Sequence, residues 1–193
     1  MRAEAVRPLT GGTSFLRTSE FIMPFATLVP GGLTEVGREG GIFISVPVDN
    51  TTHLLFWGLW NDSQAMGDRG AFFALEPLTD LDNYATFEGD ESNNWGQDRG
   101  AMARGHYSGF TKRLLQEDVV VQMSMGEIAD RTQENIISTD LAVVRCRQRL
   151  LKLLESFESG EDIRGVLSSY DPQIYPVGKV IEAEADLISS VLL

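Results

Sequence analysis

Two apolar segments joined by a short polar link constrain the fold of this 193-residue chain more than any other feature. GIFISVPVD (residues 41–49) and HLLFWGLWND (residues 53–62) are rich in aromatic and β-branched side chains, which favour extended strands. Three polar residues, Asn50, Thr51 and Thr52, join the two segments. The segments therefore predict an antiparallel hairpin.

The residues before the hairpin also predict strand structure. TSFLRTSEFIMPF (residues 13–25) is again aromatic and β-branched, which is typical of a strand. Pro30, Gly31 and Gly32 follow and mark a turn before the hairpin. Residues 63–113 carry a weaker signal, with frequent Gly, Asp and Asn, and predict a long loop. Such a loop is either functional or a surface excursion, and composition does not decide between them.

The C-terminal half predicts a long amphipathic helix that starts near Thr139 and ends at Gly160. Ser138 or Thr139 can cap its start. Its apolar residues recur at three- and four-residue spacing on one face: Val143, Cys146, Leu150, Leu153, Leu154 and Phe157. We interpret Cys146 as a small buried hydrophobic residue rather than a reactive thiol. Strands followed by such a helix predict an α+β domain with a helix on one face of an antiparallel sheet.

Charge and composition exclude several classes of protein. The formal net charge of −12 disfavours binding to nucleic acid, because an acidic surface repels phosphates. No apolar run is long enough to span a membrane, and the N-terminus lacks the apolar core of a signal peptide, so we expect a cytoplasmic protein. One cysteine, Cys146, excludes a disulfide framework and a cysteine-based cluster. Two histidines, His53 and His106, leave few imidazole ligands for a metal.

A Glu-Asp pair inside an apolar run, LLQEDVVVQMSMG, is the most unusual local feature. Charged side chains are rarely buried unless they are paired or bind a metal. If the segment is a strand, its side chains point alternately to the two faces of a sheet. As a helix, it directs Glu117 to water, one turn from Arg113, and Asp118 toward an apolar face with Gln122 as its polar neighbour. The pattern alone leaves open whether Asp118 is partly exposed, satisfied by backbone or arginine, or a metal ligand.

A second distinctive block is NNWGQDR, residues 93–99. We interpret its Asn and Asp residues as caps of a helix that starts near Gln97, with Arg99 pairing to Asp98 or Asp130. Contact with a substrate is the alternative. Asp130 and Arg131 are expected to form a structural ion pair.

The order of several blocks resembles one family: MPFATLVPGG, then GIFISVPVDNTTHLLFW, then SNNWGQDRGAMARGHYSGF, then LLQEDVVVQMSMGEIADRT followed by STDLAVVR. This order is similar to the C-terminal part of the catalytic domain of Rieske non-haem iron oxygenases. The nearest branch is the phthalate 4,5-dioxygenase-like group, which includes aryl-ether O-demethylases. The resemblance covers about residues 13–155.

The resemblance implies a helix-grip (START/Bet v1-like) α+β fold, which we expect to be incomplete here, in which two histidines and one carboxylate hold a mononuclear Fe(II). Asp118 matches the carboxylate ligand, which favours the helical interpretation. Gln122 and Met125 would line the pocket near iron, although ordinary packing explains them equally well. Trp57, on the hairpin, is a further candidate for the pocket wall.

Several parts that the family requires are missing from this sequence. The Cys-x-His and Cys-x-x-His motif of the Rieske domain is absent, and no His-x4-His spacing supplies the other iron ligands. His53 and His106 match neither ligand position, so an improvised triad with Asp118 is disfavoured. A single carboxylate cannot hold Fe(II) tightly. We therefore expect no catalytic residue in this chain apart from the metal ligand Asp118.

We therefore expect residues 1–160 to be the C-terminal portion of an oxygenase catalytic domain and residues 161–193 a C-terminal extension. The intact enzyme would hydroxylate or O-demethylate an aromatic acid, using O₂ and electrons from NAD(P)H. Its implied partners are a chain or segment with the 2Fe–2S Rieske cluster and the histidines, a reductase, and further copies forming a homo-oligomer, a trimer in the family. The alternative is a non-catalytic helix-grip domain that binds an apolar small molecule.

Overall fold

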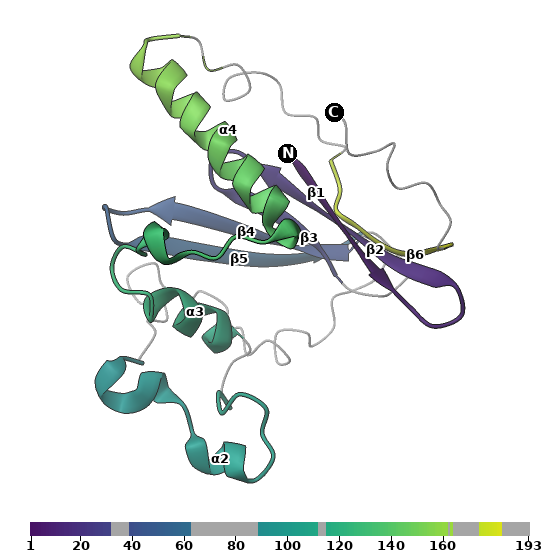
Figure 1. Ribbon diagram of the computed structural model, residues 1–193, viewed down its shortest axis with the longest axis vertical. Coiled ribbons are helices and arrows are strands. Elements are labelled where there is room, and N and C mark those ends of the chain that lie inside the picture. The colour runs from purple at the N-terminus through teal and green to yellow at the C-terminus, as the bar shows by residue number, and fades with distance from the viewer. Residues whose placement is uncertain (32–38, 63–88, 112–114, 162, 164–173, 183–193) are drawn as a thin grey trace. The chain divides into compact units, whose positions relative to one another are not determined.

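The computed structural model describes residues 1–31, 39–62, 89–111, 115–161, 163 and 174–182. The chain divides into two compact units. Unit 1 comprises Met1–Ala65 and Asn135–Leu193, and unit 2 comprises Met66–Glu134. Unit 1 carries an open antiparallel sheet and a long helix, whereas unit 2 carries short helices (Figure 1). The predicted α+β class is therefore confirmed.

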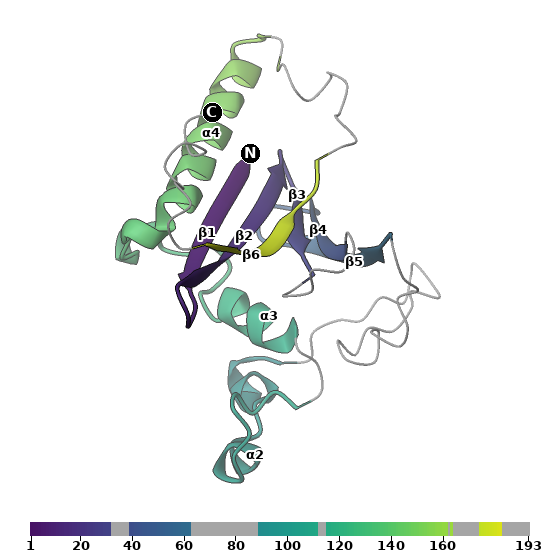
Figure 2. The same ribbon diagram turned by 90° about the vertical axis from the view of Figure 1, so that its right-hand side faces the viewer.

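The sheet of unit 1 is an antiparallel meander in the order β1-β2-β3-β4-β5, with β6 paired to β2. Its strands are β1 (Arg2–Pro8), β2 (Thr13–Ile22), β3 (Ala26–Pro30), β4 (Glu39–Pro47), β5 (His53–Asn61) and β6 (Val177–Glu182). Along one edge, β2 pairs with β1; along the other, it pairs with β3 near its C-terminal end and with β6 near its start. Figure 2 shows β6 crossing beside β2.

The predicted hairpin is confirmed as β4 and β5, whose register places Phe43 opposite Trp57. Its turn is closed by Asp49, whose Oδ1 accepts hydrogen bonds from the backbone N–H groups of Thr51 at 2.8 Å and Thr52 at 2.7 Å. The strand predicted over residues 13–25 is confirmed over residues 13–22, as β2, whereas residues 23–25 form a turn. Pro30 lies at the end of β3. Gly32, the last residue of the predicted turn, lies outside the described residues.

Two consecutive glycines in β4 make room for two tryptophans on opposite faces of the sheet. A Cβ atom on Gly40 would lie 2.5 Å from Trp60 Cζ2 and 2.6 Å from the Val29 carbonyl oxygen. A Cβ atom on Gly41 would lie 3.1 Å from Trp57 Nε1. The Trp57 ring stacks on Phe43 with a centroid separation of 5.5 Å and an interplanar angle of 10°. Glycine at these positions therefore allows the aromatic rings to lie against the strand.

A buried carboxylate on β2 is compensated by an arginine on β1. Glu20 is only 5% exposed, and its Oε1 accepts a hydrogen bond from Arg2 Nε at 2.5 Å. The strand register places these two residues directly opposite each other. Because the buried charge needs this partner, the pair favours the observed register of β1 on β2.

The long helix of unit 1 is α4 (Leu141–Glu158), preceded by the 3₁₀ helix η3 (Ser138–Asp140). The predicted end is confirmed, because Gly160 follows α4 with a φ of +75°. The predicted cap is wrong: Asp140 occupies the N-cap position, and no side chain caps this end. None of the described helices is both long and apolar enough to cross a lipid bilayer.

Fully buried apolar side chains are few in the described part of the chain. Buried apolar residues there are Ala26, Leu28 and Ala101. On the predicted apolar stripe of α4, Cys146 is half-buried, whereas Phe157 remains 66% exposed. The stripe is present, but no residue of α4 reaches full burial. The pKa of the Cys146 thiol is raised, and the largest cause is desolvation by partial burial.

Unit 2 contains η1 (Glu91–Gly96), α2 (Arg99–Ala103), α3 (Leu115–Met123) and η2 (Arg131–Gln133). The helical interpretation of the Glu-Asp segment is therefore confirmed by α3. The loop predicted over residues 63–113 is wrong in its second half, because local caps fold η1 and α2 there. Residues 63–88 of that prediction lie outside the described part of the chain.

We predict that Gly40→Ala will destabilise the sheet by about 1–3 kcal/mol, because the added methyl group meets both a tryptophan ring and backbone. Gly58→Ala is the matched control, since its Cβ would meet a single side-chain atom, Ile42 Cγ2 at 3.1 Å. Urea unfolding of the two variants measures the difference. Equal losses would contradict the prediction.

Candidate functional site

The distinctive NNWGQDR block begins with a tightly capped turn. Asp90 Oδ1 accepts from the backbone N–H groups of Ser92 at 2.8 Å and Asn93 at 3.2 Å. In return, Asn93 Oδ1 accepts from the N–H groups of Asp90 at 2.9 Å and Gly96 at 3.0 Å. These bonds surround Asn94 and Trp95, whose φ angles are 55° and 58°. Such left-handed conformations are costly for non-glycine residues and require support of this kind.

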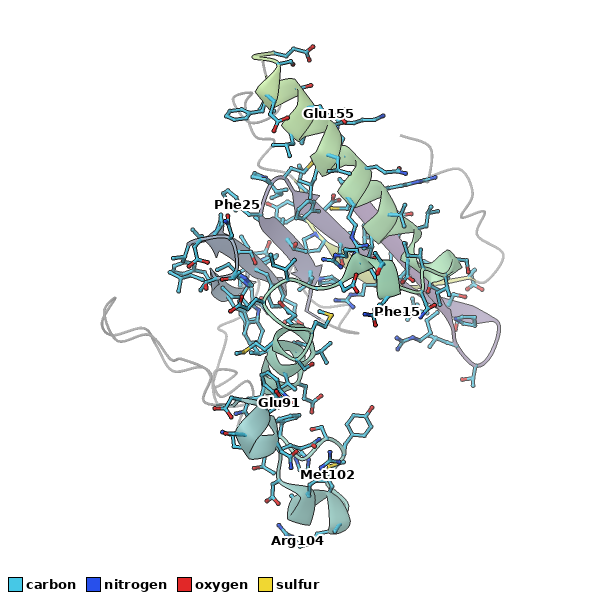
Figure 3. The ribbon with its side chains drawn as sticks, turned by 60° about the vertical axis from the view of Figure 1, so that its left-hand side comes forward. Phe15, Phe25, Glu91, Met102, Arg104 and Glu155 are labelled. Atoms are coloured by element: carbon cyan, nitrogen blue, oxygen red, sulfur yellow. The ribbon has the colours of Figure 1, made fainter. Side chains whose placement is uncertain are left out.

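The second part of the block caps a helix, as predicted. Asp98 is the N-cap of α2, and its Oδ1 accepts from the Ala101 N–H group at 2.8 Å. The predicted ion pair of Arg99 with Asp98 or Asp130 is wrong. Arg99 Nη1 lies 3.8 Å from Met102 Sδ, whereas Asp98 lies 3.7 Å from Arg104 Nη2 and Asp130 accepts from Thr132 and Gln133. Figure 3 labels Met102 and Arg104 at the end of this helix and Glu91 at the start of η1. The exposed Asp98–Arg104 pair adds little stability.

The following segment, GHYSGF, is bound back onto the same block. Gln97 Nε2 donates to the Ser108 carbonyl oxygen at 2.6 Å, and the Asp98 N–H group donates to the Gly109 carbonyl oxygen at 3.0 Å. Gly109 has a φ of +81°, and a Cβ atom there would lie 2.9 Å from the Asp98 carbonyl oxygen. Glycine is therefore required for this close approach.

The Glu-Asp pair is oriented opposite to the helical interpretation, and Asp118 agrees with the alternative of a partly exposed side chain. Glu117 is half-buried and accepts a hydrogen bond from the Ser108 hydroxyl group, whereas Asp118 is exposed. The apolar pattern predicted an inward Asp118 and an outward Glu117, because such a pattern contains no information about a polar partner outside the helix. Both carboxylates lie in the first turn of α3, where negative charge favours the helix N-terminus.

The predicted pocket residues belong to both compact units. Asp118 and Gln122 lie on α3 and Met125 lies just beyond it; all three are exposed. The Met125 N–H group donates to the Gln122 carbonyl oxygen at 3.3 Å, which closes the helix end. Trp57 lies on β5 in unit 1, half-buried on Phe43. Its assignment to the pocket wall stays a prediction.

The described residues do not provide a complete metal site. Within that part of the chain, no group of three or more His, Cys, Asp or Glu residues is arranged to hold a metal ion. His53 is exposed at the start of β5. His106 is also exposed, and its Nδ1 accepts from the Gly109 N–H group at 3.0 Å. That bond occupies one of the two ring nitrogens of His106.

Asp130 has a capping role rather than the predicted ion pair. Its Oδ1 accepts from the Thr132 hydroxyl group at 2.7 Å and the Thr132 N–H group at 3.0 Å, and it caps η2. Arg131 pairs with Glu134 at 2.5 Å instead. The Thr132 side chain, followed by Gln133, lowers the pKa of Asp130 below its usual 3.8. Hydrogen bonds that favour the charged carboxylate cause this shift.

Sequence reasoning missed two residues of this network, Gln97 and Ser108, which connect three separate segments. Both residues and their partner Glu117 lie in blocks that carry the resemblance: NNWGQDR, GHYSGF and QED. What the resemblance did not indicate is that these blocks are joined by side-chain hydrogen bonds.

The sheet, the capped turns and α3 together define the class of this protein: a mixed α+β domain with an open antiparallel sheet. Residues 1–187 match the family described as LigXa C-terminal domain like, and the chain belongs to that family. This match confirms the resemblance found in the sequence.

Three curated relatives are oxygenase subunits. The chain is 30% identical over 165 residues to the phthalate 4,5-dioxygenase oxygenase subunit of Pseudomonas putida, covering 82% of this chain and 36% of that protein. It is 29% identical over 160 residues to the 3-chlorobenzoate-3,4-dioxygenase oxygenase subunit of Comamonas testosteroni, covering 76% and 37%. It is 32% identical over 65 residues to the 5,5'-dehydrodivanillate O-demethylase oxygenase subunit of a Sphingobium species, covering 34% and 15%.

The chain thus spans little more than a third of the two longer-matched relatives. It corresponds to a C-terminal portion of the oxygenase subunits of aromatic-ring dioxygenases and O-demethylases. The comparisons do not favour the alternative of a metal-free domain that binds an apolar molecule.

We predict that Thr132→Val will raise the pKa of Asp130 toward 3.8, because the largest cause of the lowering is removed. Since the folded-state pKa is depressed, the stabilisation from Asp130 is fully present above its unfolded value and is lost as pH falls through the folded value. NMR titration of the side-chain carboxyl carbons measures this midpoint. Asp49, whose pKa is lowered first by the Thr51 backbone, is the control and should not move.

Proposed function

We propose that this chain is the C-terminal portion of the catalytic subunit of a Rieske-type mono- or dioxygenase that acts on an aromatic acid. The observation that carries the proposal is the family match over residues 1–187, together with relatives that are oxygenase subunits. The names of those relatives refer to phthalate and 3-chlorobenzoate, which supports an aromatic acid as the substrate class. The intact enzyme would hydroxylate or O-demethylate this substrate, using O₂ and electrons from NAD(P)H.

Asp118 is the carboxylate ligand of the mononuclear iron in this proposal. Three features support it: Asp118 occupies the QED position of the resemblance, it lies on a helix, and its side chain is exposed rather than engaged in packing. A rigid helix is a suitable support for a metal ligand. The described residues provide no complete ligand set, so we assign the two histidines to another chain or segment.

The same proposal specifies architecture and partners. Residues 1–160 form part of a helix-grip domain, and residues 161–193 form a C-terminal extension. The 2Fe–2S cluster is supplied from outside this chain, electrons come from an NAD(P)H-dependent reductase, and the assembly is a homo-oligomer, a trimer as the resemblance implies. Gln122, Met125 and Trp57 remain candidates for the substrate pocket. Sparse burial among the described residues agrees with a chain that needs further polypeptide to cover its apolar surface.

A chimera tests this function. This chain replaces the matching C-terminal part of the Pseudomonas putida phthalate 4,5-dioxygenase oxygenase subunit, which retains its own N-terminal part. We predict that the chimera will bind mononuclear Fe(II) anaerobically and that Asp118→Ala will abolish this binding, because removal of one of three protein ligands leaves too few. Mössbauer spectroscopy separates mononuclear iron from cluster iron.

Glu127→Ala is the matched control for Asp118→Ala, since Glu127 is also an exposed carboxylate close in sequence to α3. It should leave the iron content unchanged. Mononuclear iron retained in Asp118→Ala would exclude Asp118 as a ligand. A folded chimera without mononuclear iron, alongside an unsubstituted subunit that binds it, would overturn the proposed function.

A further inference from the structure

A chain of side-chain hydrogen bonds connects three segments of unit 2. Gln97, from the NNWGQDR block, donates to the Ser108 carbonyl oxygen at 2.6 Å. The hydroxyl group of the same serine donates to Glu117 on α3, and both partners are half-buried. Ser108 Oγ also accepts from the Phe110 N–H group at 3.3 Å. The backbone carbonyl of Ser108 thus binds the NNWGQDR block, and its hydroxyl group binds α3.

The bond to Glu117 restricts the rotation of α3 about its axis. Consecutive residues of an α-helix point about 100° apart, because 3.6 residues complete one turn. When Glu117 points toward Ser108, Asp118 must therefore point elsewhere on the helix surface. The observed burial follows this rule: Gln116, Glu117, Val119 and Val120 are half-buried, whereas Asp118, Val121 and Gln122 are exposed.

We propose that Glu117 is a positioning residue, held by Ser108, that directs Asp118 outward from α3 toward the ligands supplied by the rest of the enzyme. The functional part of this inference rests on the proposed role of Asp118 as an iron ligand. The orientation itself rests on the Ser108–Glu117 bond and the burial of the two helix faces. In this arrangement the two adjacent acids have separate tasks: Glu117 fixes the helix and Asp118 is presented.

A competing explanation for Glu117 is its charge alone. It lies in the first turn of α3, where any carboxylate favours the helix N-terminus. Glu117→Gln distinguishes the two explanations, because the amide oxygen still accepts from the Ser108 hydroxyl group although the charge is gone. If Glu117 acts by positioning α3, the mobility of α3 in Glu117→Gln equals that of the parent. If Glu117 acts through its charge alone, the mobility equals that of Glu117→Ala.

The experiment uses a nitroxide spin label on the full chain, attached through Asp118→Cys in a Cys146→Ala background so that no other thiol reacts. Electron paramagnetic resonance line shapes report the mobility of α3. We expect greater mobility in Glu117→Ala and in Ser108→Ala, and parental mobility in Glu117→Gln. The Ser108→Ala/Glu117→Ala double variant should equal Ser108→Ala, because the single serine variant already removes the bond to Glu117 together with the bond from the Phe110 N–H group.

A control label at Leu151→Cys, an exposed position on α4 in unit 1, reports general unfolding. Its line shape should stay constant in every variant. The proposal is overturned if the label at position 118 is equally mobile in the parent and in both alanine variants, or if Glu117→Gln loosens it as much as Glu117→Ala. It is also overturned if both labels loosen together, since the bond would then support folding in general.

Iron binding by the chimera separates this inference from the proposed function. We expect Glu117→Ala to weaken mononuclear Fe(II) binding roughly 10–100-fold, as is typical when the support of a metal ligand is removed, and Glu117→Gln to restore it. Loss of iron in Asp118→Ala without any change in Glu117→Ala would refute the positioning role and leave the function intact. Iron retained in Asp118→Ala would refute the ligand role, whatever the spin labels show.

Discussion

Backbone pairing through β2 is the constraint on which unit 1 depends. This strand pairs with β1 along one edge and with β3 and β6 along the other, so it joins the two ends of the chain in one sheet. Among the described residues of the sheet, Ala26 and Leu28 are the fully buried apolar side chains. Since an unpaired buried backbone group is costly, β1, β3 and β6 together satisfy the hydrogen-bonding groups along both edges of β2.

The sequence predicted those elements whose signals are local. The β4–β5 hairpin was predictable because both strands and their polar link lie within about twenty residues, and α4 because its apolar spacing repeats over several turns. β1 was missed because RAEAVRP is mostly polar or small, and β6 because its partner lies at the other end of the chain. Strand pairing between such distant segments leaves no trace in local periodicity.

In the candidate site, too, an interaction between separate segments could not be predicted from local sequence, as Glu117 and Asp118 show. The helical conformation of Glu117 and Asp118 was predictable, but their orientation was not. Apolar neighbours on the helix indicated that Asp118 points inward, whereas the half-buried carboxylate is Glu117, which has a polar partner in Ser108. Hydrophobic periodicity assigns the inward face by apolar content and therefore fails where a hydrogen bond holds a charged side chain there.

An exposed Asp118 also avoids a difficulty that a buried ligand would create. A buried, ionised carboxylate without a partner is strongly unfavourable, so a chain that supplies one ligand to a shared site would be destabilised if that ligand were enclosed in advance. Under the proposed function, exposure keeps the Asp118 side chain hydrated until a cation and the other ligands arrive. Under the proposed function, metal binding and association with the histidine-bearing polypeptide are then linked equilibria, and each must strengthen the other.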